Sequence, residues 1–244
     1  DYLYDVKAVY GGGDLAAYNP TNATSSDQAL RNASRPEVII DGCDLTSIRQ
    51  VYCGGNAAST PATYVRVNGT YEIDEVFGGG NGKDDYQLND GEWYQNPGAN
   101  VGYQSYTRYD KGGTQGTGDS ATPYLALDNT DAGTKEQRQA YYRYGSGYAT
   151  TEVVGGHVHM VYGGSNQKGN ISTMALSVYQ ESGTCDLIYD KTYGAGKNAD
   201  IDGEARVALD CVAKGGQLFG GSTNADVNSD VMLNVTNGTF TQVF

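Results

Sequence analysis

A short segment that ends in an aromatic residue followed by glycines recurs along the chain and constrains the fold more than any other feature. It reads VYCGGN at 51–56, VFGGGNG at 76–82, VYGGSN at 161–166 and LFGGSTN at 218–224. The aromatic positions of this motif are Tyr10, Tyr52, Phe77, Tyr162, Tyr193, Phe219 and Phe244, separated by 42, 25, 85, 31, 26 and 25 residues. A period near 25 residues indicates stacked supersecondary units. The longer gaps indicate one period that carries an insertion.

The repeated unit is built from strands, because apolar residues alternate before several copies of the motif. Val207, Leu209 and Cys211 alternate in ARVALDC, and the same pattern occurs in TYVRVNG and VMLNV. A second strand then leads into each motif. Short strands joined by glycine turns at this period predict an all-β fold, a parallel β-helix of about six coils of about 25 residues each. Equivalent residues of successive coils would then stack roughly 4.8 Å apart.

Stacking explains each position of the motif. The aromatic side chains form a ladder of rings, so Phe77 is expected to contact Tyr162 despite the 85 residues between them. The glycines allow a sharp turn with positive φ against the same turn of the next coil. The asparagines, which can bond their own turn and the asparagine of the next coil, are Asn56, Asn81, Asn166, Asn198 and Asn224. We therefore interpret the motif as a corner.

These glycine-rich segments resemble the repeat of right-handed parallel β-helix proteins of the pectate-lyase-like superfamily. More narrowly, they resemble the VYGGG-repeat surface proteins of Bacteroides-type bacteria. The resemblance covers most of the chain outside the insertions and implies one single-stranded, right-handed β-helix domain over residues 1–244. It also implies an exported protein of the cell surface. The superfamily implies polysaccharide substrates, but the chain has no lyase motif onto which catalytic residues could be carried.

Two segments exceed the period and are predicted to be insertions. The smaller, residues 14–36, is polar and coil-like, whereas residues 83–144 are rich in tyrosine and contain the only tryptophan. Within the larger one, Thr134 and Gln137 form a capping box and Gly145 a stop signal, which predicts a helix. Long insertions of a solenoid usually lie on one face, often the binding face.

The aromatic residues of the larger insertion have two interpretations. They either form a small core of the insertion or provide a surface that recognises a glycan or a protein, since rigid amphipathic rings bind at low entropic cost. The candidate ligand-binding residues are Trp93, Tyr94, Tyr103, Tyr106, Tyr109, Tyr141, Tyr142 and Tyr144. We expect the binding interpretation to fail if fewer than about three of these rings face solvent.

The charge of the chain limits its partners. A formal net charge of −13 repels phosphate backbones and anionic lipids, which argues against nucleic acid and membrane surfaces. No apolar run is long enough to span a bilayer. The segment GGGNGKDD resembles a phosphate-binding loop, but it is one residue short and lacks the serine or threonine, so no nucleotide cofactor is expected.

Two patterns suggest metal ions. In HVH, His157 and His159 lie on one face of a strand, a potential metal pair, although the equivalent positions of other coils, such as Glu72 and Asp74, suggest outward polar sites. The segment NADIDGE at 198–204 resembles the start of a calcium loop but lacks the glutamate at its twelfth position. Together with NADVNSD one coil later it could share a Ca²⁺, or both could be solvated turns.

Carboxylates and cysteines leave alternatives open. Glu72, Asp74 and Glu75 cluster, and either this group or a second one could be half of a glycosidase or lyase site beside Arg66 or Arg108. The second group is Asp84, Asp85, Asp90 and Glu92. The four cysteines include no C-x-x-C pair, which argues against structural zinc.

Two of the cysteines share a position relative to the motif. Cys185 and Cys211 both lie eight residues before a motif aromatic, so they should stack in adjacent coils. They could form a disulfide there or remain buried free thiols.

Three functions are consistent with these features. The first is a non-enzymatic, adhesin-like surface protein that presents the aromatic insertion to a glycan or protein. The second is a polysaccharide lyase or glycoside hydrolase, and the third is a structural spacer. Because Phe244 aligns with the motif aromatic and no polar cap follows, we expect a longer stack or a partner at that end.

Overall fold

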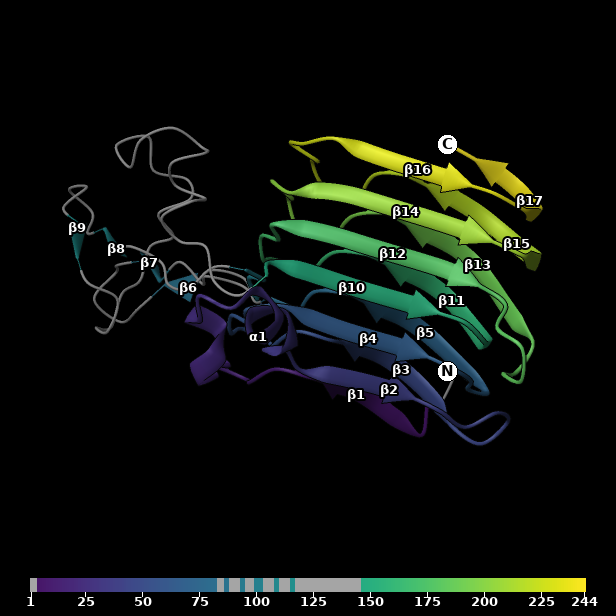
Figure 1. Ribbon diagram of the computed structural model, residues 1–244, viewed down its shortest axis with the longest axis horizontal. Coiled ribbons are helices and arrows are strands. Elements are labelled where there is room, and N and C mark those ends of the chain that lie inside the picture. The colour runs from purple at the N-terminus through teal and green to yellow at the C-terminus, as the bar shows by residue number, and fades with distance from the viewer. Residues whose placement is uncertain are drawn as a thin grey trace.

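The computed structural model describes residues 4–82, 86–87, 93–94, 99–102, 108–109, 115–116 and 146–244. The chain forms a parallel β-solenoid of about five turns, close to the predicted six coils (Figure 1). Its seven-stranded sheet contains β1 (Val6–Tyr10), β3 (Ser47–Tyr52), β5 (Glu72–Phe77), β11 (Gly156–Tyr162), β13 (Leu187–Tyr193), β15 (Val212–Phe219) and β17 (Gly238–Val243). Its six-stranded sheet contains β2 (Glu37–Ile40), β4 (Thr63–Val67), β10 (Tyr148–Val153), β12 (Thr173–Tyr179), β14 (Glu204–Asp210) and β16 (Val231–Val235). Neighbouring strands of both sheets pair in parallel, as the repeat predicts.

Apolar side chains of the two sheets fill the space between them. In β4, Val65 and Val67 are fully buried, and in β14, Val207 and Leu209 are buried, which confirms the predicted alternation in these strands. Cys211 lies beyond β14 and is exposed, and Val231 and Val235 are exposed because β16 is the last strand of its sheet.

Strands of the seven-stranded sheet follow a different spacing. Val158 and Val161 of β11 both reach the core, so the two residues between them lie on the outer surface. In β11 these two consecutive residues are His159 and Met160, and in β13 the equivalent pair is Asp190 and Lys191.

The motif aromatics form a second, separate column outside the main core. Neighbouring rings of the column lie 4.7–5.1 Å apart between centroids and are nearly parallel, with interplanar angles of 3–12°. Phe77 and Tyr162 stack at 4.7 Å although 85 positions separate them in the sequence. The prediction of lateral registry across the long excursion is therefore confirmed.

The glycines that follow the aromatics lie at one edge of the solenoid, which we call the glycine–asparagine edge (residues 54–56, 78–81, 163–166, 194–198 and 220–224). The predicted reason for these glycines is wrong at Gly54 and Gly164, whose backbones are not left-handed. A Cβ on Gly164 would lie 2.7 Å from the backbone nitrogen of Gly196, and one on Gly54 would lie 2.9 Å from that of Gly80. Glycine is required because the turns of adjacent coils approach too closely for any side chain.

The asparagines of this edge form the predicted ladder. Asn81 Nδ2 donates to Asn56 Oδ1 at 2.8 Å, and Asn166 Nδ2 donates to Asn81 Oδ1 at 2.9 Å. Asn224 Nδ2 continues the pattern at 3.0 Å from Asn198 Oδ1. The motif is therefore a corner held by side-chain amides as well as by rings.

The opposite edge connects the six-stranded sheet to the seven-stranded sheet and contains the disulfide. Cys185 is bonded to Cys43, 142 residues earlier, so both predicted alternatives, a bond between Cys185 and Cys211 or two buried free thiols, are wrong. Cys211 is an exposed free thiol with a left-handed φ of 53°. Both Cys185 and Cys211 lie between strands, outside the paired register, so the distance to the motif aromatic does not fix their neighbours.

The smaller insertion follows β1 and lies at the glycine–asparagine edge, where Tyr18 N donates to Ser59 O at 3.0 Å. It is not wholly coil, because it contains the short 3-10 helix η1 (Thr21–Thr24) and the helix α1 (Gln28–Ala33). Asp27 caps α1 by accepting a hydrogen bond from Ala29 N at 2.8 Å. Figure 1 shows α1 beside the stack, on the side where the larger insertion leaves it.

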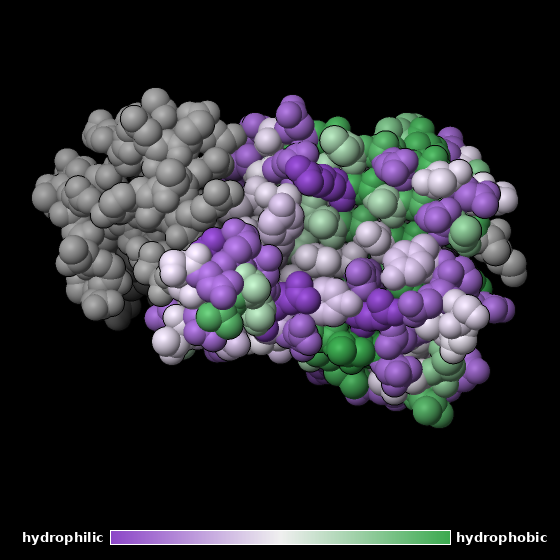
Figure 2. Space-filling view, in the orientation of Figure 1, coloured by the Kyte–Doolittle hydropathy of each residue, from purple (hydrophilic) through white to green (hydrophobic). Residues whose placement is uncertain are grey.

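The larger insertion contributes two short antiparallel hairpins to the described residues. One pairs β6 (Tyr86–Gln87) with β7 (Trp93–Tyr94), and the other pairs β8 (Arg108–Tyr109) with β9 (Gln115–Gly116). At the far end of the stack, Val231 and Met232 of β16 are 43% and 58% exposed, and Phe244 is 62% exposed. Figure 2 shows hydrophobic surface over these C-terminal coils. This end therefore carries apolar side chains, as the sequence predicts.

Candidate functional site

The side chains predicted to bind a ligand lie outside those that the structure describes. They are Trp93, Tyr94, Tyr103, Tyr106, Tyr109, Tyr141, Tyr142 and Tyr144. The helix predicted from Thr134 and the carboxylates Asp84, Asp85, Asp90 and Glu92 also lie outside the described residues. Their roles stay predictions. What the structure does describe is how the larger insertion is attached to the solenoid.

Residues 99–102, within the predicted insertion, form part of the stack. Ala99, Asn100 and Val101 are at most 1% exposed, and Val101 forms parallel bridges to Thr60 on one side and Ile171 on the other. The segment therefore completes a coil at the glycine–asparagine edge. It divides the larger insertion into two excursions, residues 83–98 and 103–145.

Each excursion leaves and returns to the stack at adjacent points. At the first excursion, Ala99 N donates to Lys168 O at 3.1 Å, and a Cβ on Gly82 would lie 2.0 Å from the same oxygen. At the second, a Cβ on Gly102 would lie 2.4 Å from the Cα of Gly147. The described residues that flank each excursion are therefore fixed in buried backbone and lie next to each other.

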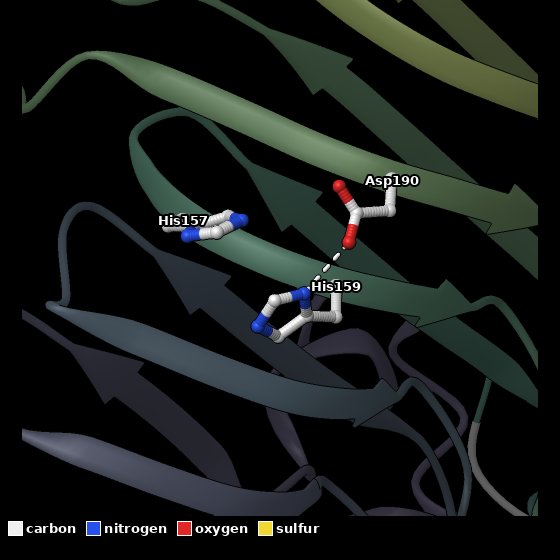
Figure 3. A group of neighbouring side chains, drawn as sticks. All are labelled: His157, His159 and Asp190. Atoms are coloured by element: carbon white, nitrogen blue, oxygen red, sulfur yellow. Dashed lines mark hydrogen bonds and ion pairs between the residues drawn. The ribbon is translucent and has the colours of Figure 1, made fainter.

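The two histidines of the chain meet an aspartate on the outer surface of the seven-stranded sheet (Figure 3). His157 and His159 of β11 lie with their ring centroids 4.4 Å apart. Asp190 comes from the adjacent strand β13, and its Oδ2 lies 2.7 Å from His159 Nδ1. One potential ligand atom from each residue lies within 4.8 Å of the other two. In the described part of the chain, this is the one such group of three or more histidine, cysteine or acidic side chains.

Strand β5 places carboxylates on the other side of His159. Glu72 Oε2 lies 3.7 Å from His159 Nε2, and the Glu72 side chain is only 7% exposed. Burial lowers the pKa of His159, but the hydrogen bond and charge of Asp190, with contributions from Glu72 and Asp74, outweigh it and raise the pKa above its ordinary value. Burial and then the charge of Glu75 raise the pKa of Asp74.

Sequence reasoning placed the two histidines beside Glu72 and Asp74, and the strand register confirms that placement. It missed Asp190. The signal was present, because Asp190 precedes Tyr193 by three residues just as His159 precedes Tyr162. Since the aromatics stack, residues at the same distance before them also lie side by side.

The predicted calcium loops stack, but amide groups already use their carboxylates. Asp202 Oδ2 accepts from Asn170 Nδ2 at 2.7 Å, and its Oδ1 accepts from Asn228 Nδ2 at 3.2 Å. Asp226 N donates to Asp200 Oδ1 at 3.0 Å. These contacts explain the acidic and amide residues of the loops as bonds between coils.

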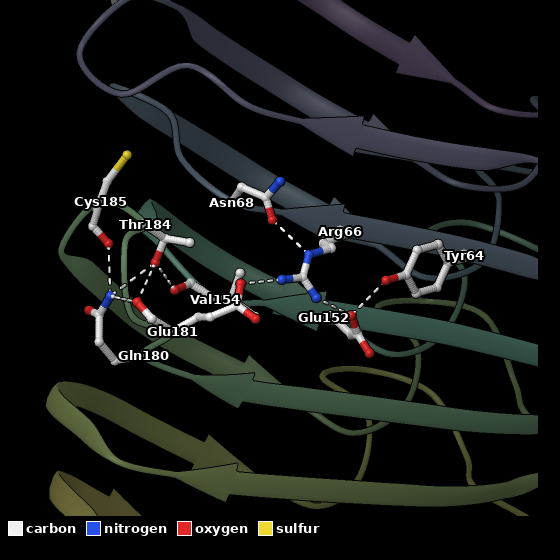
Figure 4. Close-up of polar contacts among 9 residues, drawn as sticks. All are labelled: Tyr64, Arg66, Asn68, Glu152, Val154, Gln180, Glu181, Thr184 and Cys185. Carbon is white, nitrogen blue, oxygen red and sulfur yellow. Dashed lines mark hydrogen bonds and ion pairs between the residues drawn. The ribbon is translucent and has the colours of Figure 1, made fainter.

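Arg66 is not a partner of the Glu72 cluster, because it lies on the outer surface of the other sheet (Figure 4). Its guanidinium donates to Glu152 at 2.8 Å and to Asn68 at 2.7 Å, and it also pairs with Glu181. Tyr64 Oη donates to Glu152 at 2.7 Å. Each charge in this network has an opposite partner, so it offers no open site.

No protein-family model, curated protein or solved structure matches the chain. The superfamily and the surface-protein family that the motif resembles therefore remain a hypothesis, whereas the parallel β-solenoid is established by strand pairing. None of the helices in the described ranges is long and apolar enough to cross a membrane.

Proposed function

We propose that the chain is a non-enzymatic, adhesin-like solenoid of the cell exterior that presents residues 83–144 to a glycan. The observation that carries the proposal is the attachment of this insertion. Both of its excursions begin and end at adjacent buried residues of one edge, with residues 99–102 fixed between them. A rigid scaffold that holds closed loops suits binding, because loops on a fixed frame lose little entropy when they bind.

The smaller insertion supports the same assignment of the binding edge. It follows β1 and is bonded at Ser59, so both insertions leave the solenoid at the glycine–asparagine edge. In solenoids, insertions gathered on one side usually mark the binding face. The tyrosines and the tryptophan of the larger insertion suit stacking against sugar rings, and they suit a protein surface as the alternative.

The Cys43–Cys185 disulfide supports an exterior location. Disulfides form and persist in oxidising compartments and are rare in the cytosol. Gly69, in a turn between these two cysteines, leaves room for the bond, since a Cβ there would lie 2.1 Å from Cys185 Sγ. The turn sequence is therefore adapted to the disulfide.

The test is to remove each excursion separately and keep the coil intact. In one variant, residues 84–98 are replaced by two glycines, and in the other, residues 103–145 are replaced in the same way. Deleting the whole insertion would also remove the buried residues 99–102. We expect wild-type protein to bind sugars on a glycan array and the variant without residues 103–145, which contained most of the predicted aromatics, to lose that binding.

The thermal midpoint and circular dichroism of both variants serve as controls, and they should remain close to those of the wild type. Deletion of residues 14–33 from the same edge provides a matched loss of loop without loss of the tyrosine-rich segment. Glycan binding that survives both excursion deletions would refute the proposal. A wild-type chain that binds no glycan would leave a protein partner or a spacer role.

A second candidate, a polysaccharide lyase or glycoside hydrolase, is favoured by a pocket on the seven-stranded sheet. Its lining includes Asp74, His159, Asp190 and Lys191. Burial and the charge of Glu75 raise the pKa of Asp74, which is the direction that favours a general acid. Turnover of polygalacturonate, followed by reducing ends and by absorbance of unsaturated products, would support this function if Asp74→Asn abolished it. Turnover that Asp74→Asn leaves intact would exclude this pocket.

A further inference from the structure

We propose that His157, His159 and Asp190 bind one divalent transition-metal ion, with zinc as the reference ion. This inference is independent of the proposed glycan binding. The three residues supply two imidazole nitrogens and one carboxylate oxygen, a donor set that zinc and its neighbours in the first transition row prefer. Calcium and magnesium prefer oxygen ligands alone, so the donor set discriminates against them.

The distances between the donor atoms are close to those of a zinc-bound site. Zinc lies about 2.0–2.2 Å from nitrogen and oxygen ligands, so donor atoms of a tetrahedral site are roughly 3.5 Å apart. One donor of each residue already lies within 4.8 Å of the others. Changes of side-chain rotamer would close the remaining distance, because His157 and His159 alternate on one strand and Asp190 lies on the next.

The hydrogen bond between His159 and Asp190 does not prevent this binding. It joins Nδ1 to Oδ2 at 2.7 Å, and a metal ion would replace the proton that these two atoms share. Glu72 Oε2, 3.7 Å from Nε2 of the same ring, would then orient the imidazole from the side away from the ion, a common arrangement around zinc ligands.

The surrounding charges favour a cation. On one side of His159, the neighbouring strand β5 carries Glu72, Asp74 and Glu75. On the other side, β13 carries Asp190 and Lys191. Lys197 is paired with Glu75. The carboxylates therefore outnumber the cationic groups near the two imidazoles, in a chain whose net charge is already −13.

The site is held by the fold and not by a flexible loop. Gly156, Val158 and Val161 of β11 pair with residues of β13, and Val158 and Val161 are fully buried beneath the outer surface. Both rings are half-buried and Asp190 is exposed, so an ion can enter from solvent. An ion here would link two neighbouring coils in the middle of the stack.

The experiment titrates the untagged chain, after treatment with a chelator, with Zn²⁺ alone in a calorimeter. We expect one ion per chain. Asp190→Asn and His159→Gln should each weaken binding by about tenfold or more, and replacement of both histidines should abolish it. Glu204→Gln removes a carboxylate from the other sheet, and this control should change the affinity by less than about twofold.

Two further readouts separate a built site from general cation attraction. Co²⁺ bound to nitrogen and oxygen in a tetrahedral site gives visible absorption that the double-histidine variant should lack. The chain has only two histidines, so their ring protons are easily assigned in a nuclear magnetic resonance spectrum. Zn²⁺ should shift the imidazole proton resonances of both rings. Zinc binding that the double-histidine variant retains, or no binding by wild-type chain, would overturn the proposal.

Discussion

The two edges of the solenoid obey different rules. At the glycine–asparagine edge, the turns of successive coils lie against each other. Rings, glycines and amides therefore recur at equivalent positions of each coil. At the opposite edge, the connections differ in length and sequence, and Cys185 bonds to Cys43 across the intervening coils. Turns also touch at the opposite edge, where a Cβ on Gly155 would lie 2.3 Å from Asn68 O, but the residues in contact there differ from coil to coil and form no common motif. The following predictions test this difference.

The largest effect is expected at the opposite edge, from loss of the disulfide. Cys43→Ser combined with Cys185→Ser should lower the free energy of unfolding by about 2–5 kcal/mol, because the bond closes a loop of 142 residues in the unfolded chain. Denaturant unfolding with and without reductant measures this. Cys211→Ser is the control and should have little effect, since that thiol is unpaired and exposed. An unfolding midpoint unchanged by reduction would contradict the expectation.

The second largest loss of stability is expected when a glycine of the glycine–asparagine edge is replaced, whereas a glycine of the opposite edge should tolerate the same replacement. Gly164→Ala should cost about 1–3 kcal/mol, because its Cβ would lie 2.7 Å from the backbone of Gly196 and the stacked turns must separate. Gly42→Ala at the opposite edge should change stability by less than about 0.5 kcal/mol, since its Cβ would lie 4.0 Å from its nearest neighbour, the Cβ of Leu45. Thermal unfolding compares the two. Equal costs would show that stacking does not restrict the first edge.

A smaller effect is expected within the amide ladder. Asn81 donates to Asn56 and accepts from Asn166, so Asn81→Ala should cost about 0.5–1.5 kcal/mol through the loss of these hydrogen bonds at a half-buried position. Asn224→Ala, at an exposed position near the end of the ladder, should cost less. Chemical denaturation of both variants provides the comparison, and a cost at Asn224 as large as at Asn81 would argue against a continuous ladder.

The last prediction concerns chemical reactivity and involves the smallest change to the protein. The molecule has two free thiols, one at each edge: Cys53 and Cys211. Burial raises the pKa of Cys53 to about 12, and the hydrogen bond to Asp210 raises the pKa of Cys211. Because the thiolate is the reactive form of cysteine, modification of either thiol by a disulfide reagent should become faster as the pH rises. At pH 8, a disulfide reagent should modify exposed Cys211 in the native protein and Cys53 only after unfolding. Cys211→Ser should abolish the native reaction, and prompt modification of two thiols would contradict the buried position of Cys53.

Much of the fold could be predicted because a solenoid converts sequence distance into spatial contact. The stacking of Phe77 on Tyr162 and the bond between Asn81 and Asn166 follow from their equivalent positions in the motif. The candidate metal cluster follows the same rule, since Asp190 and His159 occupy equal distances before their aromatics. Counting back three residues from Tyr162 and Tyr193 would have placed Asp190 beside His159.

Other features could not be predicted because the repeat does not govern them. The pairing of Cys185 with Cys43 depends on the paths of two connections outside the strand register. The role of residues 99–102 depends on where the chain returns to the stack, which spacing alone does not give. The predicted positive φ holds at Gly82 but was wrong at Gly54 and Gly164, where the restriction comes from the neighbouring coil and not from the local turn.

The sequence by itself determined the stacked architecture, because equivalent rings, glycines and asparagines at one period have a physical role only when coils lie upon one another. Only the tertiary structure decided which unrelated residues meet: the disulfide, the buried segment 99–102 and the closed ends of the excursions. Those contacts depend on the lengths and paths of the connections between strands, which the period of the motif does not set.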